Sequence, residues 1–266
     1  MAIGNWATHT AGPVHHALQL GAPSSLECVS IEGRSNITFP NHATIRLDFP
    51  ARGGMPAVKV FYHDSARSTD ADVYRVPGME DETILPPPDN LAEKGRPKVL
   101  RTRAGGPGGG GPGAGRRPQR DVRVGPGGPG VAVFGEGRGG GPQNGILTGN
   151  GAVFIGTKGI MATCNRGEGV WLLPSARWKE YVLPPQLLTR SPGHMLDWIR
   201  ASKGGEPSCS DFSIAVPYAE WLALAAIAFR VPGKLDWDSK DLRFTNNPAA
   251  NQLLKPVFRK EWELTI

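Results

Sequence analysis

The stretch TFPNHATIRLDFPARGGMPAVKVFYHD, from Thr38 to Asp64, decides the predicted fold. It contains two strand candidates, Ala43–Phe49 and Ala57–His63. In the first strand apolar residues alternate with polar ones, as in IRLDF, which is typical of a sheet that buries one face. No helical pattern separates the two candidates, and consecutive strands of this kind favour an antiparallel or mixed sheet.

Further strands and helices are predicted on both sides of this stretch. One strand candidate, Ser25–Ile31, precedes it, and a hairpin turning at Thr157 and Lys158 is expected further along. Proline and glycine positions predict a short helix from Pro13 to Leu20, and the apolar run WLALAAIAF predicts a core helix. The remaining elements are the hairpin strands Ala152–Gly156 and Gly159–Thr163, a strand Val170–Leu173, a helix opened by Ser191 and Pro192 with an apolar stripe of Met195, Trp198 and Ile199, a helix from about Val216 to Arg230, and a short helix started by Asn247 and Pro248.

These elements predict an α+β fold with a large, open, mostly antiparallel or mixed sheet and helices packed on one face. A disordered Gly/Pro/Arg-rich insertion is expected to interrupt the domain. Residues 1–93 form its first part, residues 94–144 the insertion and residues 145–266 its second part.

The positive charge of the chain lies in that insertion. The chain has 30 basic and 24 acidic residues, and Lys94 to Arg138 holds ten of the former and two of the latter. The other parts, with 20 basic and 22 acidic residues, are nearly neutral. RNA association through the insertion is one hypothesis, but the aromatic side chains on which bases stack are missing there. A solvated loop expansion is the preferred interpretation, and no nucleic-acid partner is expected.

Several other classes of protein are disfavoured. The G-x-G-x-x-G pattern near Gly135 is followed by residues that start helices poorly, and no acidic residue follows at the spacing of a dinucleotide site. The longest apolar run is half the length of a membrane span, so no membrane partner is expected. Cys28, Cys164 and Cys209 are too far apart for a CxxC metal site and are expected to be reduced. No secretory signal opens the chain, and a cytoplasmic location is the default expectation for a compartment that the sequence does not identify.

A family resemblance rests on several collinear segments. They are IGNWATHTAGPVHHALQLGAPSSLE from Ile3, the stretch quoted first, GAVFIGTKGIMAT from Gly151, RSPGHMLDWIRASKGG from Arg190 and LDWDSKDLRFTNNPAANQLLKPVFRKEWEL from Leu235. Together they resemble the bacterial type of Gfo/Idh/MocA C-terminal domain. Members of that family pair a Rossmann domain, which binds NAD or NADP, with an α/β domain whose open sheet shapes the sugar site and often builds an oligomer interface.

The resemblance implies that this chain is the C-terminal substrate and oligomerisation domain of an NAD(P)-dependent sugar or polyol oxidoreductase. It implies that the chain begins near the domain junction, so that the nucleotide-binding half and its catalytic lysine would be missing. A truncated form that is not active alone is expected. Its expected partners are a sugar or polyol substrate, a Rossmann-domain chain and further copies of itself. NAD or NADP belongs to full-length relatives, and no cofactor is expected for this chain alone.

The resemblance also implies the candidate site residues. The family has a D-x-x-x-H pair at the start of this domain, and His9 matches the histidine, whose imidazole can accept a hydroxyl proton. Asn5 stands in place of the aspartate and can orient a hydroxyl but cannot carry its proton. Trp6 is a candidate for stacking on the sugar, and His194 for lining the cleft. The alternative is that His9 is a polar residue near an exposed terminus, and the adjacent His15 and His16 are expected at the surface.

Three functions therefore remain open. The first is an oxidoreductase domain that acts with an NAD(P)-binding partner. The second is a non-catalytic sugar-binding or assembly module, which Asn5 favours. The third is a nucleic-acid-associated protein, which would require salt-dependent RNA binding through the insertion.

Overall fold

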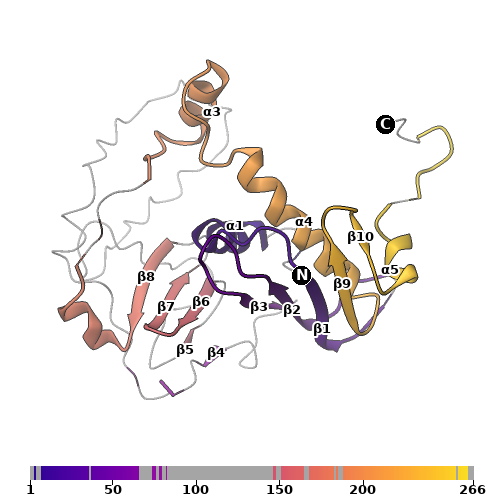
Figure 1. The fold of residues 1–266 in the computed structure, drawn as a ribbon, viewed down its shortest axis with the longest axis horizontal. Coiled ribbons are helices and arrows are strands. Elements are labelled where there is room, and N and C mark those ends of the chain that lie inside the picture. The colour runs from indigo at the N-terminus through magenta and orange to yellow at the C-terminus, as the bar shows by residue number, and fades with distance from the viewer. Residues whose placement is uncertain are drawn as a thin grey trace, which may run out of the picture.

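Figure 1 shows the fold of the chain in a computed structural model. The predicted insertion at 94–144 lies outside the residues that the structure describes. Those residues are 3, 7–35, 37–65, 74–75, 78–79, 82, 146–147, 151–164, 168–182, 184, 188–255 and 257–262.

The largest element of the fold is a five-stranded antiparallel sheet. Its strands lie in the order β10-β9-β1-β2-β3, so strands from the two ends of the chain pair in one sheet (Figure 1). The three strands predicted near the start of the chain are confirmed, whereas β9 and β10 were missed. The strands are β1 (Ser25–Glu32), β2 (His42–Phe49), β3 (Val58–Ser65), β9 (Lys234–Asp238) and β10 (Arg243–Phe244).

The predicted alternation of β2 is what builds the core. Every second residue from Ala43 to Phe49 is buried, while the residues between them are half-exposed. Helix α4 (Phe212–Ala228) lies on β1, and Trp221 of this helix packs edge-on against Phe49, with 6.1 Å between the ring centroids. Full burial of an aromatic side chain of this kind contributes about 1.5–3 kcal/mol. Strand alternation and the apolar run WLALAAIAF thus meet in one core.

Helix α1 (Ala7–Leu18) begins earlier than predicted. The start at Pro13 was wrong, because Pro13 lies inside the helix and is exposed. An internal proline removes one backbone hydrogen bond and costs about 3 kcal/mol. Packing offsets this cost, since Ala7, Ala11 and His15 form a buried stripe that shares the core with α4.

The end of α1 is closed by a residue from the loop between β2 and β3. The Arg52 guanidinium donates to the carbonyls of Leu18 and Gln19, the latter at 2.6 Å from Nε. Unpaired carbonyls at a helix end favour such a cation. Gly21 follows with a φ of +66°, a conformation that glycine adopts without strain.

A second, smaller antiparallel sheet contains β6 (Gly151–Gly156), β7 (Gly159–Cys164) and β8 (Glu168–Leu173). The predicted hairpin between β6 and β7 is confirmed, with the turn at Thr157 and Lys158. Ala162, Trp171 and Leu173 form a small core of their own. The predicted α+β class is confirmed, and the described strands divide among this sheet, the five-stranded sheet and a two-stranded ladder of β4 (Tyr74–Arg75) and β5 (Ile146–Leu147).

The remaining helices test the helix starts that were predicted from capping residues. The predicted start of α5 (Pro248–Gln252) is confirmed, because Asn247 Oδ1 accepts from the Ala250 N–H at 3.0 Å. Helix α3 (His194–Ser202) begins after Gly193, so the predicted start at Ser191 and Pro192 was wrong. The Ser191 hydroxyl instead accepts from the Gly193 N–H at 3.2 Å, so this oxygen is used two residues ahead of the N-cap position, Gly193. A 3-10 helix, η2 (Ser175–Lys179), precedes α3. No helix in the described part of the chain is long and apolar enough to cross a membrane.

Candidate functional site

His9 lies on the first turn of α1 and is exposed. The buried stripe of α1 runs through Ala7 and Ala11, and a residue two positions from Ala7 projects from the opposite side of a helix. The imidazole is therefore directed away from the core. Asn5 and Trp6, the other two candidates near it, lie outside the described residues.

The chain just ahead of these candidates is attached to β3. The Ile3 N–H donates to Asp64 Oδ2 at 3.0 Å, and both residues are buried. A hydrogen bond from a buried amide to a carboxylate contributes about 1.5–3 kcal/mol. Asp64 thus holds the entry to α1 against the edge strand of the large sheet (Figure 1).

Asp64 and its neighbour Tyr62 are residues that the sequence reasoning missed. Both lie on the core side of β3, opposite Ala43 and Ile45 of β2. Burial, and secondly the Asp64 charge, raise the pKa of Tyr62 far above its usual range. Its phenol therefore remains neutral and can donate or accept a hydrogen bond at any physiological pH. The available signal was the position of Asp64, a carboxylate in register with the apolar residues of a strand.

His15 is also placed differently from the expectation. It was predicted at the surface together with His16, but only His16 is exposed. The His15 Nδ1 accepts a hydrogen bond from Trp221 Nε1 at 3.3 Å, and Tyr218 packs edge-on at 6.1 Å between ring centroids. Burial, followed by the charges of His16 and Arg52, lowers the pKa of His15. A neutral imidazole is what this contact requires, since a protonated Nδ1 could not accept from Trp221.

His194 and His9 lie on different helices. His194 is the first residue of α3 and is exposed. Figure 1 shows α3 at the outer end of α4, apart from α1. The structure therefore gives no shared cleft between these two histidines.

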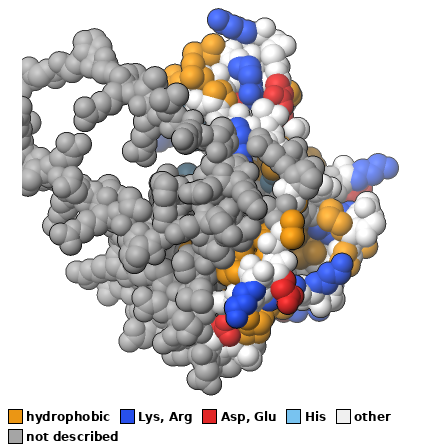
Figure 2. All heavy atoms as spheres, turned by 90° about the vertical axis from the view of Figure 1, so that its left-hand side faces the viewer, with side chains coloured by type: hydrophobic (Ala, Val, Ile, Leu, Met, Phe, Trp, Pro, Cys, Tyr) orange, Lys and Arg blue, Asp and Glu red, His pale blue; other side chains and the backbone are white. Residues whose placement is uncertain are grey.

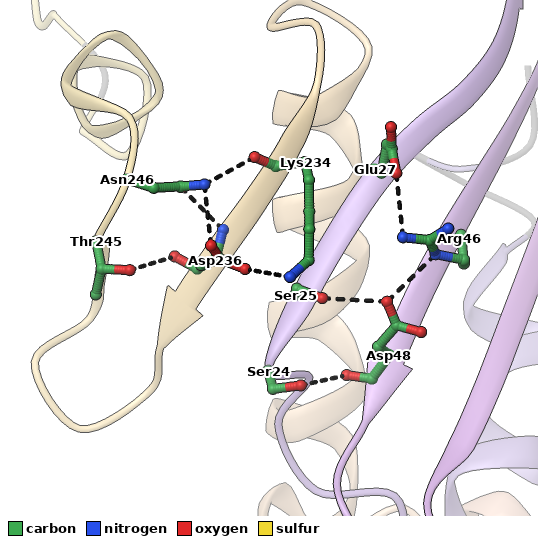
Figure 3. Close-up of polar contacts among 9 residues, drawn as sticks. All are labelled: Ser24, Ser25, Glu27, Arg46, Asp48, Lys234, Asp236, Thr245 and Asn246. Atoms are coloured by element: carbon green, nitrogen blue, oxygen red, sulfur yellow. Dashed lines mark hydrogen bonds and ion pairs between the residues drawn. The ribbon is translucent and has the colours of Figure 1, made fainter.

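The face of the large sheet that carries no core residues has an ordered set of polar contacts (Figure 3). Arg46 lies between Glu27 and Asp48, with nitrogen–oxygen distances of 3.1 and 3.2 Å. The Ser25 hydroxyl donates to Asp48 Oδ2 at 3.1 Å. One strand further, Lys234 pairs with Asp236 at 2.8 Å, and Asn246 donates to the same carboxylate at 3.1 Å. The two basic and three acidic side chains of this set nearly balance, so this face offers hydroxyl, amide and carboxylate groups without a strong net field.

The described residues do not match a nucleotide site. A dinucleotide is held where a parallel strand leads into a helix N-terminus. All strand pairs that the structure describes are antiparallel, and α1 precedes the first strand. The described part of the chain therefore does not contain the strand-to-helix arrangement with which a Rossmann domain holds a dinucleotide.

The same residues give little evidence of a metal site or of a reactive cysteine. No group of three or more His, Cys, Asp or Glu side chains in the described ranges could hold a metal ion. Cys28 and Cys209 are free thiols, as predicted, and burial raises the pKa of each. A raised pKa disfavours the reactive thiolate.

Comparison with known proteins gives no match: no protein-family model, no curated protein and no solved structure is significantly similar to this chain.

Proposed function

We propose that this chain is the substrate-binding and oligomerisation domain of an NAD(P)-dependent oxidoreductase of the Gfo/Idh/MocA type, acting on a sugar or polyol. The collinear segments that resemble the family motivate the proposal. The antiparallel sheet with helices on one face and a polar opposite face is in keeping with it. Because the described residues do not form a Rossmann-type site, the proposal assigns the nucleotide to a separate domain, in the same polypeptide or in a partner chain.

The observation that carries the proposal is the position of His9. It is exposed on a helix whose opposite side is packed in the core and whose entry is fixed by the bond from Ile3 to Asp64. An imidazole on such a rigid element can contact a ligand hydroxyl and accept its proton. Asn5, four residues earlier in the sequence, would orient a second hydroxyl through its amide.

The test is binding of cyclic polyols and aldohexoses to the full chain, followed by NMR shifts of the histidine ring signals. We expect saturable shifts at His9, at least about tenfold weaker binding in His9→Ala, and unchanged binding in His16→Ala. His16 is a matched control because it is an exposed histidine of the same helix. Binding that is equal in both variants, or no binding to any sugar of the panel, would contradict the proposal.

A non-catalytic sugar-binding or assembly module is the second candidate. The amide of Asn5 favours it, because the carboxylate that would stabilise a charged imidazole is replaced. Asn5→Asp separates the two candidates. Under the oxidoreductase proposal this change raises sugar-dependent NAD(P) reduction in the presence of a family nucleotide-binding domain, whereas a pure binding module gives no turnover with either residue.

A further inference from the structure

The segment from His194 to Val216, called the α3 arm below, buries an acidic side chain and exposes its large apolar ones. This is the reverse of the usual distribution in a folded protein. It comprises α3, the loop 203–211 and the first turn of α4. The buried residue of α3 is Asp197. Its large apolar side chains are solvent-exposed, with Met195 at 69%, Leu196 at 59% and Trp198 at 62%. The predicted apolar stripe therefore exists but does not face this protein's own core.

The contacts of Asp197 explain the reversal. Its carboxylate accepts from Arg200 at 2.6 Å and from the Cys209 N–H at 2.8 Å. Arg200 also donates to the Pro207 carbonyl at 3.2 Å. The loop is thus fastened to the polar side of α3, and the apolar side is left facing outward.

Further exposed apolar side chains lie at the start of α4. Phe212 follows Cys209 by three residues, so the start of α4 lies within about 10 Å of the loop attachment. Phe212 is 80% exposed, and Val216, one turn later on the same side, is 55% exposed. Figure 2 shows hydrophobic side chains gathered at the upper end of the molecule, at the height of α3 in Figure 1.

The size of this surface matches one side of a protein interface. Six residues contribute to it: Met195, Leu196, Trp198, Ile199, Phe212 and Val216. With roughly 200 Å² for a fully exposed large side chain, their exposed area is on the order of 700 Å². This sum approaches the roughly 800 Å² that each partner buries in a stable complex.

Charge decides what kind of partner fits. From His194 to Val216 the arm has two basic residues, Arg200 and Lys203, and three acidic ones. Asp197 and Arg200 are already paired with each other. Nucleic acids and anionic membranes recruit clusters of Lys and Arg beside an exposed face, and the arm has none. Its complement is a surface that is equally apolar and near-neutral.

We propose that the α3 arm binds the α3 arm of a second copy of this chain and forms a two-fold dimer. A two-fold axis brings the same patch of both copies together. A stripe at positions i, i+3 and i+4, as in Met195, Trp198 and Ile199, is the pattern with which helices pack in pairs. This inference does not depend on the proposed sugar or nucleotide chemistry.

The test is sedimentation velocity of the full chain over a range of concentrations. The wild-type mass rises from the 28.4 kDa monomer towards its double, and Trp198→Glu weakens the dimer by about 30-fold or more. Met195→Ser has a smaller effect in the same direction. Phe61→Glu is the matched control, since Phe61 is 53% exposed on the polar face of the large sheet. Circular dichroism and thermal unfolding establish that each variant is folded.

Three outcomes would overturn the inference. The first is a wild-type chain that remains monomeric at about 100 µM. The second is a dimer that Phe61→Glu dissociates and Trp198→Glu does not, which would move the interface to the sheet face and leave the proposed function intact. The third is a monomer that floats with phospholipid vesicles through Trp198, which would make a membrane the occupant. The outcome of the His9→Ala binding test bears only on the proposed function.

Discussion

Apolar side chains of helix α4 are buried in one region of the molecule and exposed in another. Its middle and end, from Trp221 to Ala228, are packed in the core with Phe49 and the rest of the large sheet. Its first turn belongs to the α3 arm, where Phe212 is exposed and the neighbouring α3 buries a carboxylate instead of its tryptophan. The same residue types therefore stabilise the fold in one region and present a surface in the other. An apolar stripe indicates that one face of a helix will be covered, but it does not identify the molecule that covers it.

The largest expected effect contrasts the two tryptophans. Trp221→Ala should destabilise the chain by about 3–5 kcal/mol, because it leaves a cavity beside Phe49 and removes the hydrogen bond to His15. Trp198→Ala should change stability by less than about 0.5 kcal/mol at concentrations where the chain is monomeric. Urea unfolding of both variants measures the difference. Equal losses would mean that the arm is packed as tightly as the core.

A local effect of intermediate size is expected from Asp197→Ala. The change removes the acceptor of the Cys209 N–H and leaves Arg200 without its closest carboxylate. The loss of about 1.5–3 kcal/mol of local stability should speed amide exchange in residues 203–211 by about 10- to 150-fold, while exchange in β1 and β2 remains unchanged. Hydrogen exchange with mass spectrometry reports both segments. Ser210→Ala, an exposed change in the same loop, is the control, and faster exchange throughout the sheet would show that arm and core unfold together.

A pH-dependent effect is expected in the core region. The pKa of His15 is lowered from 6.5 in the folded state, so its stabilising contribution is fully present above that value. As the pH falls below 6.5, the unfolded chain takes up the proton first, and stability falls by no more than about 1.4 kcal/mol per pH unit. Asparagine at position 15 keeps an acceptor for Trp221 but does not titrate. Urea unfolding between pH 5 and pH 8 should show a steeper decrease for His16→Asn than for His15→Asn, and identical slopes would contradict this assignment.

The smallest effect is expected on the polar sheet face. Arg46→Met removes two ion pairs of partly exposed groups and should cost about 0.5–1 kcal/mol at low salt. The difference from wild type should shrink in 1 M NaCl, where charges beyond about 3 Å are screened. Thermal unfolding at both salt concentrations measures it. A loss as large as that of Trp221→Ala would show that the Arg46 network holds the sheet together.

Local signals in the sequence were sufficient for much of the fold. Strands β1 to β3 and the β6–β7 hairpin follow from alternation and turn chemistry within a few residues. The Asn247 cap of α5 is equally local. The start of α1 was missed because the proline signal was weighed without the packing that overrides it. Strand β9 was missed although Leu235 and Trp237 alternate, because its pairing partner β1 is about 200 residues away.

The candidate site was less accessible from the sequence. His9 and His194 were named from the resemblance, and the structure places them on separate helices. The pairs of Ile3 with Asp64 and of His15 with Trp221 are separated by 61 and 206 residues. Pairs of that kind depend on which strands become neighbours, and no periodicity within either segment encodes them.

The position of β9 between β10 and β1 has a consequence for synthesis of the chain. Strand β1 is an inner strand of the finished sheet, yet its partner β9 is translated only after the 168 residues from 66 to 233. At about 5–20 residues per second this interval lasts roughly 10–30 s. During that time β1 has one unpaired edge, which is a template for association with other chains. A ribosome-associated chaperone that covers nascent strand edges should therefore raise the soluble yield of this protein more than that of a protein whose sheet pairs in sequence order.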